Sequence, residues 1–109
     1  MRIVENCSRP KYLKPTLIAE VRLYGETTGR NTKVIRQGDL NVCYAEVDGE
    51  FHRQTAWLQL GLEEFKPGET RTVGFHFVSE NKAVSVFKRN GSFFIGSATP
   101  IGEAQIVCW

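Results

Sequence analysis

Apolar and polar residues alternate along most of this chain with a period of two, the pattern of strands that bury one face. In residues 17–24 every second position is apolar, and Glu20 and Arg22 occupy positions between them. Residues 71–78 alternate equally well, with bulky apolar side chains on one face. No segment of useful length carries a helical period. The pattern therefore predicts a protein built almost entirely from strands.

Turn signals divide the pattern into short strands of similar length. Beyond the two strands above, it predicts strands over residues 34–37, 40–47, 54–60, 83–88 and 92–99, and residues 101–108 could extend the last of these after a kink at Pro100. Asp48-Gly49 is a strong hairpin signal, and Lys66-Pro67-Gly68-Glu69 is a second turn. Arg89-Asn90-Gly91 is predicted to be the turn of a last hairpin. The loop over residues 25–33 is polar and contains two glycines.

The phase of each strand predicts which side chains are buried. The expected core consists of Val21, Leu23, Val42, Tyr44, Val73, Phe75, Phe77, Val86 and Ile95. Cys43 lies in an apolar run and is expected to be a small core side chain. Of the successive rings Phe93 and Phe94, one must leave the core, because neighbouring side chains of a strand point to opposite faces.

Six or seven strands at spacings of about ten residues are typical of a sandwich or a barrel. A closed barrel leaves no exposed sheet edge, which suits a chain without covering helices. We therefore predict an all-β fold, a single closed six- to seven-stranded antiparallel β-barrel over residues 17–109. Residues 1–16 contain two prolines and little alternation, so an extended N-terminal arm is expected there.

Composition adds little that points to a function. The 109 residues are 41% hydrophobic and 24% charged, which is an ordinary globular mixture. The net charge of +2 is small for a protein that binds the phosphate backbone of a nucleic acid. No apolar run is long enough for a membrane helix, and the N-terminus lacks the apolar stretch of a secretory signal. A cytoplasmic protein with no membrane partner is expected.

The residues that could support catalysis or metal binding are few and scattered. The sequence indicates no catalytic partner for either His52 or His76. The adjacent Glu63 and Glu64 would point to opposite faces of a strand, which is poor geometry for acid–base catalysis. No spacing of Cys and His residues suits a metal. The odd set of three cysteines is no disulfide framework, and a reducing cytosol argues against a bridge between Cys7 and Cys108. We expect no enzyme, no metal and no cofactor.

Four segments, taken in order, resemble a known family. The chain reads LIAEVRLYG, a TGRNT loop, FKPGET, and AVSVFKRNGSFFIGSATPIGEA. Their order and spacing are similar to those of the C-terminal, third β-barrel domain of elongation factor Tu and related translation GTPases. No phosphate-binding GxxxxGK[ST] loop is present, so the resemblance extends to the barrel alone and no nucleotide is expected.

The resemblance implies a binding surface formed by two loops that face tRNA in the family. The matching positions are Arg30 and Asn31 in the first loop, and Arg89, Asn90 and Gly91 in the last hairpin; the basic residues Lys33 and Lys88 lie beside them. The basic residues have aromatic neighbours in sequence, Tyr24, Phe93 and Phe94, and charge beside stackable rings suits RNA. The alternative is that the rings form the core and the charges protect the strand edges.

Two functions remain open from the sequence. The first is a stand-alone, non-catalytic binding module for tRNA-like RNA or for a protein of the translation machinery. The second is a protein-only interaction module, such as an immunity or antitoxin-type protein. Binding to phosphates falls steeply with salt, which would separate the two.

Overall fold

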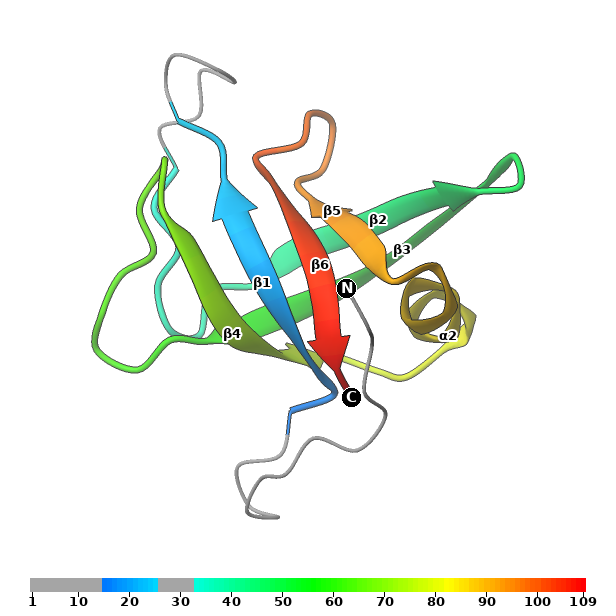
Figure 1. Ribbon diagram of the computed structural model, residues 1–109, viewed down its shortest axis with the longest axis horizontal. Helices are drawn as coiled ribbons and strands as arrows, with labels where there is room; N and C mark the ends of the chain where they lie inside the picture. The colour runs from blue at the N-terminus through cyan, green and yellow to red at the C-terminus, as the bar shows by residue number, and fades with distance from the viewer. Residues whose placement is uncertain (1–14, 26–32) are drawn as a thin grey trace.

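The computed structural model describes residues 15–25 and 33–109, and these fold into a β-barrel with one short helix (Figure 1). The elements are β1 (Leu17–Leu23), β2 (Asn41–Val47), β3 (Glu50–Gln59), β4 (Thr70–Phe77), α2 (Lys82–Asn90), β5 (Ser92–Ile95) and β6 (Gly102–Cys108). No helix within the described ranges is long and apolar enough to cross a membrane.

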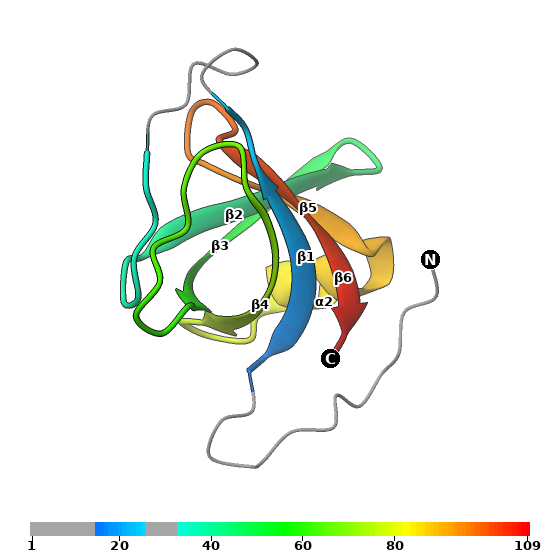
Figure 2. The same cartoon turned by 60° about the vertical axis from the view of Figure 1, so that its left-hand side comes forward.

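The six strands close into a barrel in the order β1-β4-β3-β2-β5-β6, and every neighbouring pair is antiparallel. Strand β1 pairs with β4 on one side and with β6 on the other, which completes the ring (Figure 2). The predicted fold class, a closed antiparallel β-barrel, is confirmed with six strands.

The barrel interior is filled by aromatic rings from three elements. Phe75 and Phe77 of β4, Phe87 of α2 and Phe93 of β5 are all buried, and neighbouring ring centroids lie between 5.0 and 6.0 Å apart. Seven of the nine predicted core residues are buried: Val21, Leu23, Val73, Phe75, Phe77, Val86 and Ile95.

The prediction for β2 was wrong by one residue. Val42 and Tyr44 are only half-buried on the outer face, whereas Cys43 and Ala45 point into the barrel with 0% and 3% exposure. The phenylalanine rings already occupy the space opposite β2, so this strand contributes small side chains to the interior. A shift of one residue exchanges the two faces of a strand.

The predicted strand over residues 83–88 is instead part of helix α2. The side-chain oxygen of Asn81 accepts a hydrogen bond from the Ala83 N–H at 3.0 Å, which caps the first turn. Gly91 ends the helix in the left-handed conformation, with a φ of 85°, and its N–H donates to the Phe87 carbonyl at 2.9 Å. Arg89 and Asn90 are therefore the last residues of a helix, and the predicted turn of a final hairpin is wrong.

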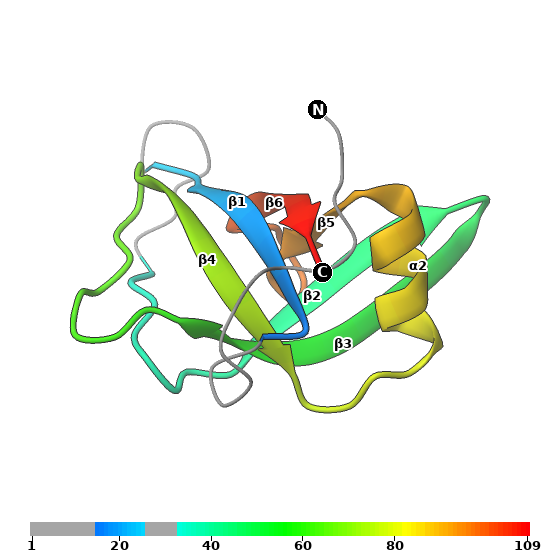
Figure 3. The same cartoon turned by 60° about the horizontal axis from the view of Figure 1, so that its bottom comes forward.

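Helix α2 lies beside the hairpin formed by β2 and β3, which extends away from the barrel (Figures 1 and 3). The turn at Asp48-Gly49 is confirmed, with φ angles of 53° and 79°. Strand β3 begins at Glu50, four residues earlier than predicted, so His52 lies inside the strand. Phe87 of the helix packs among the rings inside the barrel, whereas Val86 lies toward the hairpin with Val47.

Other sequence predictions are confirmed or shortened. The turn at Lys66–Glu69 is confirmed by a hydrogen bond from the Glu69 N–H to the Lys66 carbonyl at 3.1 Å. The strand predicted over residues 34–37 is reduced to one bridge between Ile35 and Phe65. Of the predicted N-terminal arm, the structure describes only Pro15 and Thr16.

The cysteines differ in their surroundings. Cys43 is a buried free thiol, as expected. Cys108 at the end of β6 is disulfide-bonded, contrary to expectation, and Cys7, the partner considered from the sequence, lies outside the described residues.

Candidate functional site

Among the described residues, Lys33 lies apart from the other members of the predicted binding surface. Arg30 and Asn31 lie outside the described residues. Lys33 lines a small hollow with Gly96, beyond the C-terminal end of β5, whereas Gly91 precedes the N-terminal end of that strand. Four residues of strand span about 13 Å, so Lys33 lies far from the Lys88–Gly91 segment.

Most of that segment has a structural role. The ammonium of Lys88 lies 3.5 Å from the Glu80 carboxylate and 5.9 Å from the centre of the Trp109 ring. The side-chain amide of Asn90 donates to the Ser92 carbonyl at 2.9 Å, and the Gly91 N–H is used by the helix cap. Of the two cations in this segment, Arg89 is the one that has no ion pair with any residue that the structure describes.

The most conspicuous exposed group is a row of three rings on the outer face of β3, β2 and β5. This aromatic row consists of Phe51, Tyr44 and Phe94. The Tyr44 ring lies 5.4 Å from that of Phe51 and 5.5 Å from that of Phe94. Phe51 is 57% exposed and Phe94 is 39% exposed, so both rings present apolar surface to solvent.

Strand register explains how three residues far apart in sequence form the row. Tyr44 lies directly opposite Phe94 in the β2–β5 pair. Phe51 lies opposite Glu46 in the β2–β3 pair, which makes it a diagonal neighbour of Tyr44. The expectation that one of Phe93 and Phe94 leaves the core is confirmed, because Phe93 is only 2% exposed.

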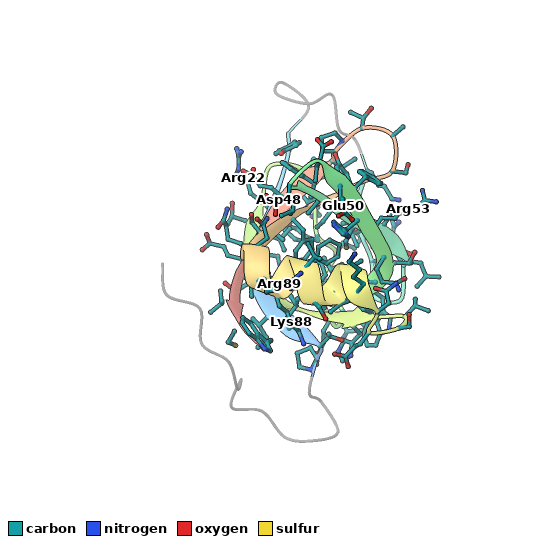
Figure 4. All side chains as sticks on the ribbon, turned by 90° about the vertical axis from the view of Figure 1, so that its right-hand side faces the viewer. Arg22, Asp48, Glu50, Arg53, Lys88 and Arg89 are labelled. Carbon is teal, nitrogen blue, oxygen red and sulfur yellow. The ribbon has the colours of Figure 1, made fainter. Side chains whose placement is uncertain are left out.

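Both signs of charge surround the aromatic row. Arg53 lies opposite Tyr44 on β3 and makes no ion pair within the described part of the chain. Glu46 and Glu103 lie opposite Phe51 and Phe94, and Arg22 binds Glu103 at 2.6 Å. Figure 4, which looks along the hairpin onto α2, shows Arg22 and Arg53 on opposite sides of the molecule.

Two tyrosines near the row remain neutral over the physiological range. Desolvation raises the pKa of Tyr44 above its ordinary value. Desolvation, followed by the charge of Glu103, also raises the pKa of Tyr24, whose ring lies 5.3 Å from the Arg22 guanidinium. The Tyr44 hydroxyl can therefore donate a hydrogen bond to a partner.

The two histidines lie in separate places. The Nε2 atom of His52 is 3.9 Å from the Glu50 carboxylate, on the face of β3 that turns toward α2. His76 lies opposite Trp57, five residues further along β3, which is about 17 Å of strand. In the described ranges, no group of three His, Cys, Asp or Glu side chains is arranged to hold a metal ion.

Sequence reasoning missed Tyr44 and Phe51, although a signal for them was present. A two-residue turn at Asp48-Gly49 pairs Val47 with Glu50 and, counting outward, places Tyr44 and Phe51 on the same face. Two aromatic residues on the outer face of a projecting hairpin indicate a surface feature rather than core.

Comparisons with family models, with curated proteins and with solved structures gave no match to this chain. The structure establishes the fold as a small six-stranded antiparallel barrel. A function has to be inferred from the chemistry of its surface.

Proposed function

We propose that this protein is a non-catalytic binding module that docks a partner protein on its aromatic row. The exposure of Phe51 and Phe94 on either side of Tyr44 is the observation that carries the proposal. The partner places an apolar side chain on the rings and a carboxylate against Arg53.

The composition of this surface supports a protein interface. Tyrosine, phenylalanine and arginine are enriched where proteins meet, and rigid rings lose little conformational entropy when they are covered. Contiguous exposed apolar surface on a small domain marks an interaction site more often than an isolated exposed residue does. Arg53 adds a charged group at the edge of the apolar patch, where solvent still reaches it.

The charges favour a protein over RNA. Surfaces that stack single-stranded RNA combine rings with a positively charged groove that follows the backbone. Here Glu46 and Glu103 lie directly beside the rings, and Lys33 and Arg89 lie at opposite ends of β5. Phosphates that approached the row would meet carboxylates.

The sequence resemblance adds a partner class to this proposal. A barrel similar to the third domain of elongation factor Tu, without its GTPase domain, would present a surface that proteins of the translation machinery recognise. The protein-only module of the immunity or antitoxin type uses the same surface chemistry. Both versions place the contact on the aromatic row.

Site-specific photo-crosslinking tests the proposal. A benzophenone side chain is introduced at Phe94, and a matched control is introduced at Leu62, which is fully exposed on a distant loop. In nuclease-treated lysate of the native cells, we expect a discrete protein adduct from position 94 and none from position 62. Phe51→Ser and Arg53→Glu, each combined with the label at 94, should weaken that adduct.

Three outcomes would contradict the proposal. Equal adducts from positions 94 and 62 would show that the row is not specific. An adduct that is lost on nuclease treatment would favour RNA, and its steep decline with salt would support that reading. An adduct whose yield is unchanged by both Phe51→Ser and Arg53→Glu would place the contact elsewhere.

A further inference from the structure

A cleft separates α2 from the β2–β3 hairpin, on the face of the hairpin opposite to the aromatic row. Its volume is about 460 Å³, within the range of small-molecule sites. Charged side chains line its walls, together with the half-buried Val47 and with Val86, which is 4% exposed. Figure 4 shows the helix that carries Arg89 lying below the hairpin that carries Asp48 and Glu50.

Two periodicities bring the charged groups to the cleft. On α2, Lys82, Val86 and Arg89 are spaced by four and three residues, so they lie along one face of the helix. On the hairpin, Glu50 and His52 share the inner face of β3, because alternate residues of a strand point the same way. A helix face with two cations thus lies opposite a hairpin face with two carboxylates.

Only part of this charge is neutralised within the protein. The Glu50 carboxylate lies 3.7 Å from the Lys82 ammonium and 3.9 Å from Nε2 of His52. Arg89 and Asp48 line the same cleft, yet neither forms an ion pair with another described residue. One cation and one anion therefore remain available to a ligand.

We propose that this cleft binds a small zwitterion, an amino acid with an aliphatic side chain. The guanidinium of Arg89 binds the carboxylate, the carboxylate of Asp48 binds the ammonium, and the side chain lies against Val47. A simple anion would be repelled by Asp48, and a simple cation by Arg89. Only a ligand with both charges satisfies both groups.

Three related probes distinguish this ligand class from either half of it. L-Leucine carries both charges, N-acetyl-L-leucine lacks the ammonium, and L-leucinamide lacks the carboxylate. Each is titrated to millimolar concentration into the ¹⁵N-labelled protein, and amide shifts around α2 and the hairpin turn are followed. We expect L-leucine to bind and each of the other probes to bind about tenfold more weakly, since each loses one charge-assisted contact.

Variants assign the two contacts. Arg89→Gln should remove the preference for L-leucine over L-leucinamide, and Asp48→Asn should remove the preference over N-acetyl-L-leucine. Asparagine tolerates the positive φ of 53° at position 48, so the turn is retained. Lys66→Gln, which removes an exposed cation that does not line the cleft, should leave all three affinities unchanged.

The proposal is overturned if L-leucine causes no shifts in the cleft, or if all three probes bind equally. It is also overturned if L-leucine affinity survives both Arg89→Gln and Asp48→Asn. Because the cleft and the aromatic row lie on opposite faces of the hairpin, crosslinking at Phe94 is a separate measurement. Either proposal can fail while the other stands.

Discussion

The indole of Trp57 lies flat against the imidazole of His76, with ring centroids 4.0 Å apart and planes inclined by 7°. The two residues face each other in the β3–β4 pair, and Nε2 of His76 lies 3.1 Å from the side-chain oxygen of Gln59. The half-buried imidazole is therefore enclosed on one face by a ring and at one edge by an acceptor. The neutral tautomer with its proton on Nε2 satisfies that acceptor.

This environment predicts a pH dependence of stability. Desolvation lowers the pKa of His76 below its ordinary value of 6.5. The unfolded chain therefore binds a proton at a pH where the folded protein does not, and stability falls as pH drops below about 6.5. The thermal midpoint of the wild type should decline between neutral and mildly acidic pH more steeply than that of His76→Gln. Parallel declines would show that His76 is not the group responsible.

The core makes a prediction about Phe75. This side chain is fully buried and lies 5.1 Å, edge to face, from Phe93. Phe75→Ala should lower the free energy of unfolding by about 3–5 kcal/mol, measured by urea denaturation. Val42→Ala, on the outer face of β2, is the matched control and should cost less than about 1 kcal/mol. A larger loss for Val42→Ala would mean that the register of β2 is shifted.

Helix α2 makes a prediction about its cap. Asn81→Ala removes the hydrogen bond to the Ala83 N–H and should cost about 1 kcal/mol of stability, whereas Asn81→Asp should retain most of it. NMR carbon chemical shifts over residues 82–90 would check the helix directly. Strand-like shifts there would contradict the structure, whatever the stability of the variants.

The buried thiol of Cys43 makes a prediction about reactivity. Burial raises its pKa well above that of an exposed cysteine, so almost no thiolate forms near neutral pH. Iodoacetamide should leave Cys43 unmodified in the native protein and alkylate it in urea, as read by mass spectrometry of the peptide that contains it. Rapid alkylation of Cys43 in the native state would place this side chain on the outer face.

Alternation predicted the barrel well, because most strands have one clearly apolar and one clearly polar face. Strand β1 is such a case, with Glu20 and Arg22 outside. In β2 both faces carry apolar residues, Val42 and Tyr44 against Cys43 and Ala45, so the pattern could not determine the phase. That choice depended on the space left by rings from other strands.

The helix was missed because its valines mimic a strand. Val84 and Val86 alternate with polar Ser85, but burial also includes Ala83 and Phe87, which is the spacing of one helix face. Asn81 and Gly91 stand where a cap residue and a terminating glycine belong. These end signals, weighed against the short alternation, would have corrected the prediction.

The candidate site was predicted least well, because it depends on strand order rather than on local sequence. Lys33 and the segment at Arg89 are basic, yet they lie at opposite ends of β5. The juxtaposition of Tyr44 and Phe51, in contrast, follows from cross-strand pairing at one tight turn, whereas Phe94 joins them through the pairing of β2 with β5. Pairing through a short turn can be read from sequence, whereas the placement of distant loops cannot.

The pairing of β1 with β6 also sets the order in which the protein can fold. Arg22 and Glu103, which face each other across this pair, are 81 positions apart in sequence. The hairpin at Asp48-Gly49 can form early, because its contacts are local, but the ring cannot close until β6 has been synthesised and has met β1. Until then β1 and β5, the two neighbours of β6 in the ring, each have an unpaired edge that can associate with other chains. On a ribosome, the last few residues of β6 thus determine when the nascent barrel can close and lose its unpaired strand edges.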